Sequence, residues 1–131
     1  MIAKRNYTIE KELQDCLNGG HNLWAIGDVH GYAETLNQLI NRLNLQSEDR
    51  VVLLGDMVDR GPKSNEVIKI VRNDPRFFSI LGNHEQMMLE NLDPLNVDCA
   101  TINNMAWLQV GGRATIKSYI YEFTNTDGQI N

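Results

Sequence analysis

Short apolar runs alternate along the chain with longer stretches in which apolar residues recur every three or four positions. Three short runs contain β-branched or aromatic residues and lead into a glycine, which is typical of buried strands. They cover residues 24–26, 51–54 and 77–81. After the first run, the apolar residues fall at i, i+3, i+4 and i+7, which predicts a helix. These residues are Leu36, Leu39, Ile40 and Leu43.

The same period predicts further helices, and the full set covers residues 7–18, 32–43, 65–73, 86–91 and 115–123. Thr8 and Ser64 are suitable caps for the first and third of these helices, and Pro75 prevents the third from continuing. Residues 93–104 are predicted to be irregular, and Gly111 with Gly112 predicts a break before the last helix. Because strands alternate with helices, the predicted fold class is α/β, with a parallel β-α-β-α-β core flanked by helices.

Length and composition fit a single domain that covers residues 1–131, without repeats or linkers. The net charge of −5 disfavours nucleic acid as a partner. No apolar stretch reaches membrane-spanning length, and no apolar run of a signal peptide follows the first residues. Cys16 and Cys99 form no Cys-x-x-Cys motif and are interpreted as thiols of a reducing compartment. We therefore expect a cytoplasmic protein with no membrane partner.

Each predicted strand leads into a polar cluster. The clusters are Asp28 with His30, Asp56 with Asp59 and Arg60, and Asn83 with His84. Because ligands bind at the carboxyl ends of parallel strands, we expect these side chains to meet. Taken singly, each cluster is better explained as a turn, a surface ion pair or a helix cap than as a functional site. Three such clusters at successive strand ends favour one site.

The residue types in these clusters suit two divalent cations. Asp28 and His30 could hold one cation from two sides, and Asp56 could bridge it to a second cation that also binds Asn83. This mixed nitrogen and oxygen set suits Mn, Fe or Zn. A pair of cations about 3.5–4 Å apart lowers the pKa of a bridging water and supports in-line attack on phosphorus.

The remaining cluster residues suit the handling of phosphate. Arg60 can hold phosphate oxygens bidentately. His84 can protonate the leaving-group oxygen, and Asp59 can orient His84. The predicted catalytic residues are therefore His84, Asp59 and Arg60, and the predicted phosphate-binding residues are Arg60, Asn83 and His84.

Three motifs in these clusters resemble those of a known family. Gly-Asp-Val-His-Gly at 27–31, Gly-Asp-Met-Val-Asp-Arg-Gly-Pro at 55–62 and Gly-Asn-His-Glu at 82–85 are similar to the amino-terminal signatures of the phosphoprotein phosphatases. That family lies within the calcineurin-like metallophosphoesterases. Residues 83–88, together with Trp107 and the Gly-Gly pair, resemble its bacterial and bacteriophage branch.

The resemblance implies a two-sheet α/β sandwich with two metal ions, most often Mn²⁺, with Fe or Zn as alternatives. It implies that Asp28, His30 and Asp56 bind the first metal and that Asp56 and Asn83 bind the second. It also implies a phosphate-binding role for Arg60 and a general-acid role for His84 with Asp59. The implied substrates are phosphoproteins or phosphopeptides, chiefly at serine and threonine.

One departure from the family pattern concerns the later part of the chain. Family members supply two further histidine ligands and another arginine, whereas no histidine follows His84 here and only Arg113 follows it among the arginines. We therefore expect the amino-terminal portion of such a domain, in which the second metal binds weakly and the chain alone is weakly active or inactive. An uncovered half of the fold would favour self-association.

Two alternative functions remain open. The first is hydrolysis of dinucleoside polyphosphates by enzymes of the same superfamily, which usually lack the aspartate that is Asp59 here. The Asp59-Arg60 pair therefore favours a protein phosphatase. The second alternative is an inactive relic or metal-binding regulatory module, which the missing histidines suggest.

Overall fold

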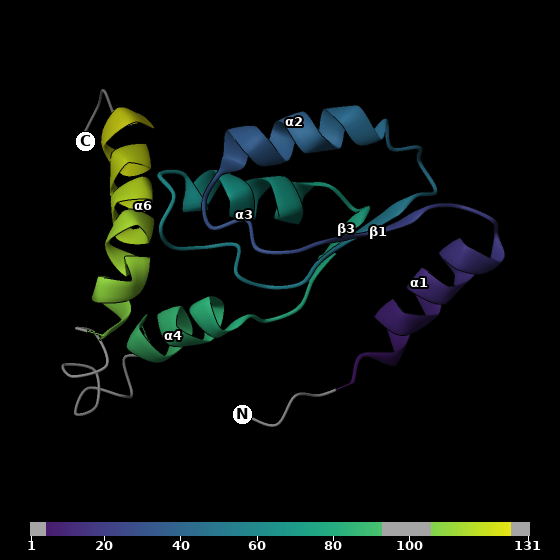
Figure 1. The fold of residues 1–131 in the computed structure, drawn as a ribbon, viewed down its shortest axis with the longest axis horizontal. Helices are drawn as coiled ribbons and strands as arrows, with labels where there is room; N and C mark the ends of the chain where they lie inside the picture. Colours follow the sequence, from purple (N-terminus) through teal and green to yellow (C-terminus); the bar gives the residue numbers. More distant parts are fainter. Residues whose placement is uncertain (1–4, 93–105, 127–131) are drawn as a thin grey trace.

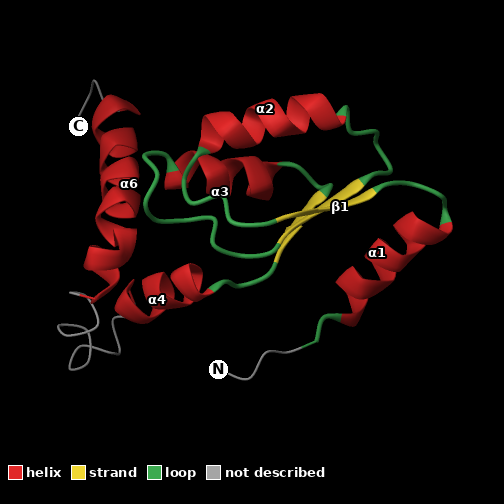
Figure 2. Cartoon of the chain, in the orientation of Figure 1, coloured by secondary structure: helices red, strands yellow, loops and turns green. Residues whose placement is uncertain are grey.

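A three-stranded parallel sheet forms the centre of the structure, a computed structural model that describes residues 5–92 and 106–126. The strands are β1 (Leu23–Ile26), β2 (Arg50–Leu53) and β3 (Phe77–Ser79), in the spatial order β1-β2-β3. Figure 2 shows that each strand leads into a loop at the same end of the sheet. The predicted α/β class with parallel strands is confirmed.

Helices α2 (Ala33–Leu43) and α3 (Ser64–Asn73) follow β1 and β2 and lie together on one side of the sheet (Figure 1). Between them and the sheet lies the hydrophobic core, in which Val51 and Leu53 of β2 have no exposed surface. Burial of such β-branched and leucine side chains is the main favourable term for this fold. The buried members of the core are Val29, Ala33, Leu36, Val51, Leu53, Met57, Val67 and Phe77.

The other described helices lie around this unit. Helix α1 (Tyr7–Asn18) precedes β1, and α4 (Asn83–Leu92) follows β3. A π-helical turn, η1 (Leu108–Gly112), leads into α6 (Arg113–Thr126). Helix α6 packs against α3, where the Asn65 side-chain amide donates a 2.9 Å hydrogen bond to Glu122. No helix in the described ranges is both long and apolar enough to cross a bilayer.

The bounds of several elements differ from the predicted ones. Helix α4 begins at Asn83, before the predicted residue 86, because the Gln86 N–H already bonds to the Gly82 carbonyl at 3.1 Å. Helix α6 runs from Arg113 to Thr126 and so extends beyond both ends of the predicted helix at 115–123. Residues 93–104, which include Cys99 and were predicted to be irregular, lie outside the described residues.

Both predicted helix caps are wrong. The side chain of Asn6, rather than Thr8, caps α1 by accepting the Ile9 N–H at 3.2 Å. Ser64 is the first residue of α3, and its buried hydroxyl accepts the Asp59 N–H at 3.1 Å instead of capping the helix. The local pattern assigned the Ser64 hydroxyl to the helix N-terminus, but in the structure this hydroxyl binds the loop after β2.

The loops after β2 and β3 are joined by the carboxylate of Glu85, which is only 5% exposed. Its oxygens accept four backbone N–H groups, from Asp56 at 2.7 Å, Met57 at 2.7 Å, Val58 at 3.1 Å and Gly82 at 3.0 Å. Hydrogen bonds to a charged acceptor are stronger than neutral ones. One side chain therefore holds two strand ends together.

The two loops approach each other too closely for side chains at the point of contact. Gly55 has a φ of +90°, and a Cβ there would lie 2.5 Å from the Cα of Gly82. Only glycine combines this left-handed backbone with the missing Cβ. The Gly-Asp and Gly-Asn starts of two sequence motifs thus have a steric cause.

Replacement of Glu85 by glutamine should destabilise the fold. At present the backbone N–H groups of Asp56 and Gly82 both donate to one oxygen of Glu85, Oε2. If the glutamine NH₂ group took the place of this oxygen, both N–H groups would face a donor and lose their acceptor. Since a hydrogen bond to a charged group contributes roughly 1.5–3 kcal/mol, we expect Glu85→Gln to lower the free energy of unfolding by about 3 kcal/mol or more. Urea denaturation followed by circular dichroism measures this change.

Glu90→Gln on the same helix is the matched control, because Glu90 is exposed. It should change the free energy of unfolding by less than about 0.5 kcal/mol. An equal effect of the two substitutions would show that the four backbone contacts of Glu85 contribute nothing specific.

The face of the sheet opposite α2 and α3 carries exposed apolar side chains. Leu54 and Ile80 extend β2 and β3 by one residue each through backbone hydrogen bonds of 2.8 and 3.0 Å, and their side chains are 50% and 55% exposed. Strand alternation places both on the face of Val52 and Phe78. An exposed apolar patch is a common site of association. The predicted self-association stays a prediction, and this is the face where we expect it.

Sedimentation velocity over a range of concentrations tests this expectation. The unmodified chain should form dimers or larger assemblies, and Leu54→Lys should shift them toward monomer because a charge would be buried in the contact. Leu17→Lys is the control, since Leu17 is equally exposed but belongs to α1 and not to the strands that carry Leu54 and Ile80. A clean monomer at every concentration would refute the prediction.

Candidate active site

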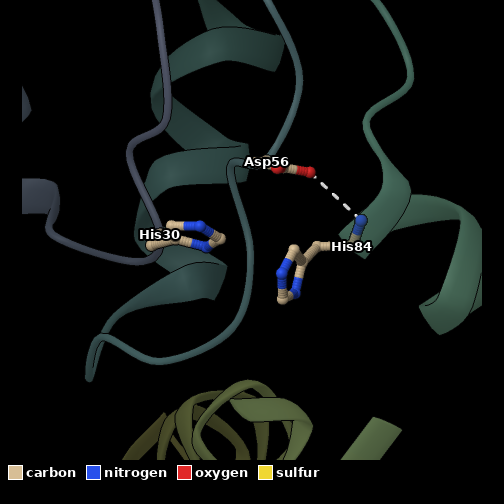
Figure 3. Close-up of side chains that lie close together, drawn as sticks. All are labelled: His30, Asp56 and His84. Atoms are coloured by element: carbon tan, nitrogen blue, oxygen red, sulfur yellow. Dashed lines mark hydrogen bonds between the residues drawn. The ribbon is translucent and has the colours of Figure 1, made fainter. Parts of the chain in front are cut away.

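The three loops at the carboxyl end of the sheet bring one residue each to a common point (Figure 3). His30 comes from the loop after β1, Asp56 from the loop after β2, and His84 from the start of α4. One ligand atom from each of these side chains lies within 4.8 Å of the other two. The predicted meeting of the three polar clusters is therefore present in the structure.

The Nδ1 side of the His30 ring is held by a backbone carbonyl. Its Nδ1 lies 2.8 Å from the carbonyl oxygen of Val58, and the side chain is buried. A carbonyl only accepts, so Nδ1 carries the proton and the lone pair of Nε2 faces the site. Asp28 is mostly exposed, and its Oδ2 lies 3.6 Å from that Nε2. The two residues can therefore reach one cation together.

Asp56 connects the other two loops. Its backbone carbonyl accepts the N–H groups of Val29 and His30 at 3.1 and 2.9 Å. Its side-chain Oδ1 accepts the His84 N–H at 3.1 Å, the contact drawn in Figure 3. This N–H belongs to the first turn of α4, where helices favour negative charge. The backbone and side chain of Asp56 together set the relative positions of the two histidines.

His84 is paired with Asp59 in the interior. The ring Nδ1 lies 2.8 Å from Oδ2 of Asp59, and both side chains are almost completely buried. The rings of His84 and His30 meet edge to face with centroids 4.6 Å apart. The pairing leaves Nε2 of His84 facing the same space as Nε2 of His30.

The guanidinium of Arg60 lies between the two histidines. Nη1 is 3.0 Å from Nε2 of His30, and Nη2 is 3.2 Å from Nε2 of His84. A guanidinium can only donate, so both Nε2 atoms act as acceptors and both rings carry their proton on Nδ1. The contacts on opposite sides of each ring thus require the same tautomer.

The donor set fits a divalent metal. Imidazole nitrogen and carboxylate oxygen suit Mn, Fe or Zn, and the Nε2 lone pair of His30 is correctly oriented for a metal. Asp28, His30 and Asp56 would hold it, and His84 also lies within reach. Arg60 would then give up its contact with His30. Asn83 opens α4 and is exposed, and its role as a ligand stays a prediction.

Strained backbone is concentrated in these loops. Among the described residues, five other than glycine have positive φ, and four of them lie in this site: His30 (45°), Asp56 (52°), Asp59 (71°) and Arg60 (68°). Such conformations cost of order 1–3 kcal/mol each and persist where the surroundings enforce them. Their grouping marks these loops as a functional site independently of the sequence motifs.

Sequence reasoning missed four residues that support the site: Glu85, Ser64, Trp107 and Thr115. Glu85 was noted only as the last residue of the third motif, Ser64 only as a helix cap, and Trp107 only as part of the branch resemblance. The one available signal was the Gly-Gly pair after the tryptophan, which marks a place of close backbone approach. The contacts of Glu85 with Asp56, and of Trp107 and Thr115 with Asp59, join segments far apart in sequence, which no local pattern reveals.

A cavity of about 870 Å³ begins at Arg60 and runs between α3 and α6. Its walls include Lys63 and Asn65 on one side and Lys117 and Tyr121 on the other. Lys63 is engaged by Glu34 at 2.7 Å and by Glu66 at 3.4 Å. The groove therefore offers both charged and apolar surface beside the guanidinium of Arg60.

Comparison with known proteins identifies relatives for this chain. The profile of the calcineurin-like phosphoesterases matches residues 21–128. The chain is 34% identical over 99 residues to the serine/threonine-protein phosphatase 2 of Escherichia coli K12, an alignment that covers 73% of this chain and 42% of that protein. It is 38% identical over 79 residues to the symmetrical bis(5'-nucleosyl)-tetraphosphatase of Nitrosococcus oceani, covering 56% of this chain and 28% of that protein.

A second serine/threonine-protein phosphatase 2, from Salmonella typhimurium, is 31% identical over 87 residues, which cover 66% of this chain and 39% of that protein. The chain thus spans about two fifths of the length of these phosphatase relatives. The extent of the profile match decides the family, because it includes all three strand-end clusters. The chain belongs to the calcineurin-like phosphoesterase family.

Proposed function

We propose that this protein is a metal-dependent phosphomonoester hydrolase of the serine/threonine protein phosphatase type. The observation that carries the proposal is the buried His84–Asp59 pair, in which Nε2 of His84 lies on the same side as Nε2 of His30 and contacts Arg60. This arrangement combines a proton carrier, a phosphate-binding cation and a metal-binding histidine in one place. The two relatives named serine/threonine-protein phosphatase 2 support this proposal.

In the proposed mechanism, each residue of the site has a separate role in hydrolysis. Two divalent cations, most suitably Mn²⁺, would supply positive charge for the phosphate oxygens and a water of lowered pKa. Arg60 holds two oxygens of the phosphate and stabilises charge that develops on them. His84, protonated on Nε2, donates that proton to the leaving-group oxygen. Asp59 holds the Nδ1–H side of the ring and stabilises its charged form.

A phosphopeptide is the substrate that we favour. In this proposal, the groove that starts at Arg60 receives the peptide chain next to the bound phosphoserine. Lys117 adds positive charge to the groove, and Tyr121 adds apolar contact area. The size of the groove, about 870 Å³, is sufficient for several side chains of a peptide.

Hydrolysis of dinucleoside polyphosphates is the second candidate, because relatives bearing the tetraphosphatase name match at similar identity. The position of Asp59 favours the first candidate. The family resemblance implies that tetraphosphatases usually lack this aspartate, and here its carboxylate is fully buried against His84. A chain that binds metal without turnover is the third candidate, supported by the absence of histidine after His84.

Binding of Mn²⁺ should depend on Asp56 but not on Arg60. We expect Asp56→Asn to weaken Mn²⁺ binding roughly tenfold or more, since a charged ligand is lost. Arg60→Ala should bind Mn²⁺ at least as tightly as the unmodified chain, because the guanidinium now occupies the lone pair of His30. Titration calorimetry, or the electron paramagnetic resonance signal of free Mn²⁺, measures both affinities. Equal affinity of Asp56→Asn and the unmodified chain would remove Asp56 from the metal site.

Hydrolysis assays distinguish the three candidate functions. With Mn²⁺ present, we expect at least about tenfold higher kcat/KM for a phosphoserine peptide than for diadenosine tetraphosphate, since Asp59 equips His84 to protonate an alkoxide. The chain alone should hydrolyse an aryl phosphate slowly at most, and any turnover should disappear in Asp56→Asn. A preference for diadenosine tetraphosphate would support the second candidate. Folded protein without turnover of any substrate would support the third.

A further inference from the structure

The carboxylate of Asp59 has three hydrogen-bond donors, of which His84 is only one. Oδ2 accepts both Nδ1–H of His84 and the indole N–H of Trp107, each at 2.8 Å. Oδ1 accepts the hydroxyl of Thr115 at 2.7 Å. Asp59 has no exposed surface, and Trp107 and Thr115 are 1% and 2% exposed. All these contacts are therefore made in the interior, where a carboxylate needs such partners.

The hydroxyl of Thr115 also fixes the backbone of Asp59. It accepts the Asp59 N–H at 2.8 Å and lies 3.1 Å from the hydroxyl of Ser64. One hydroxyl donates one hydrogen bond and accepts two, so this hydroxyl is fully used. Thr115 thus holds Asp59 by main chain and side chain at once, at a residue with a φ of 71°.

Trp107 and Thr115 lie on either side of Gly111 and Gly112, and these two glycines allow the segment to contact the loop after β2. Gly111 has a φ of 128°, and its carbonyl accepts the Arg60 N–H at 3.2 Å. A Cβ at Gly111 would lie 2.6 Å from that same nitrogen, and a Cβ at Gly112 would lie 2.5 Å from the indole ring of Trp107. The Gly-Gly pair is therefore what allows η1 and α6 to contact Asp59 and Arg60 together.

We infer that Trp107 and Thr115 are positioning residues for the general acid His84. This inference rests on the proposed function, because it assigns them to the proton-donating pair of that site. Their hydrogen bonds fix the plane of the Asp59 carboxylate, so that Oδ2 faces Nδ1 of His84. The ring is then kept as the Nδ1–H tautomer, with Nε2 directed toward the substrate.

The competing explanation is that Trp107 and Thr115 only fill the interior of the fold. Substitutions that remove a single hydrogen-bond donor separate the two explanations. Thr115→Val removes the hydroxyl at constant volume, Thr115→Ser keeps it, and Trp107→Phe removes the N–H while keeping an aromatic ring. Ser118→Ala is the control for the tautomer of His84, because the buried Ser118 hydroxyl binds Asn65 and the Thr115 carbonyl but not Asp59.

The first readout compares substrates that differ only in how much they need the acid. A phosphoserine peptide releases a strongly basic alkoxide that must be protonated, whereas p-nitrophenyl phosphate releases a stable phenolate. We expect Thr115→Val and Trp107→Phe to lower kcat for the peptide by roughly tenfold to a hundredfold, with little change for p-nitrophenyl phosphate. Thr115→Ser should leave the ratio of the two rates unchanged.

The second readout needs no turnover. Nitrogen-15 NMR of the imidazole rings reports the tautomer of His84 in the 131-residue chain. We expect one Nδ1–H tautomer in the unmodified chain, in Thr115→Ser and in Ser118→Ala. Thr115→Val and Trp107→Phe should show a mixture of tautomers while the helical circular dichroism signal is retained.

The two readouts separate failure of the inference from failure of the proposed function. A changed tautomer in a chain that hydrolyses neither substrate would support the positioning role and count against the enzyme. An unchanged His84 tautomer in folded Thr115→Val and Trp107→Phe would overturn the inference. An equal loss of rate on both substrates, with one tautomer retained, would likewise show that these residues only fill space.

Discussion

The loop that follows β2 adopts a backbone conformation that it could not keep alone. Asp56, Asp59 and Arg60 all have positive φ within five residues, and each such residue costs of order 1–3 kcal/mol. The carboxylate of Glu85 holds the first part of this loop, and the Gly111 carbonyl with the Thr115 hydroxyl holds the second part. Because both restraints come from other segments, the site forms only when α4 and α6 are docked.

The two histidines of the site share a tautomer but have different partners on Nδ1. His30 donates to a backbone carbonyl, which carries no net charge, and this suits an imidazole that stays neutral as a metal ligand. His84 donates to a buried carboxylate, which suits an imidazole that carries positive charge during proton transfer. In the proposed mechanism, the partner on the far side of each ring thus distinguishes a ligand role from an acid role in two residues that touch each other.

The sequence predicts the parts of this molecule that depend on local pattern. The parallel strands, the helices after them and the meeting of His30, Asp56 and His84 follow from periodicity and from strand polarity. The caps were wrong because Ser64 binds Asp59, five residues earlier, and because Asn6 caps α1 in place of Thr8. Glu85 and Thr115 were missed because their partners lie 27 to 29 and 56 residues away. A single sequence without structure carries no information about such pairs.

The guanidinium of Arg60 is the positive charge that faces both histidines of the site. It faces Nε2 of each ring, and Asp28 and Asp56 lie beside them. A divalent cation on His30 would bring two positive charges to a place where Arg60 now supplies one, so the carboxylates would also be compensated with metal bound. The backbone of Arg60 has its own anchor, the 3.2 Å hydrogen bond from its N–H to the Gly111 carbonyl, which does not depend on the position of the guanidinium. Arg60 also lines the groove, and in our proposal a guanidinium that gives up its contact with His30 would bind the phosphate ester there.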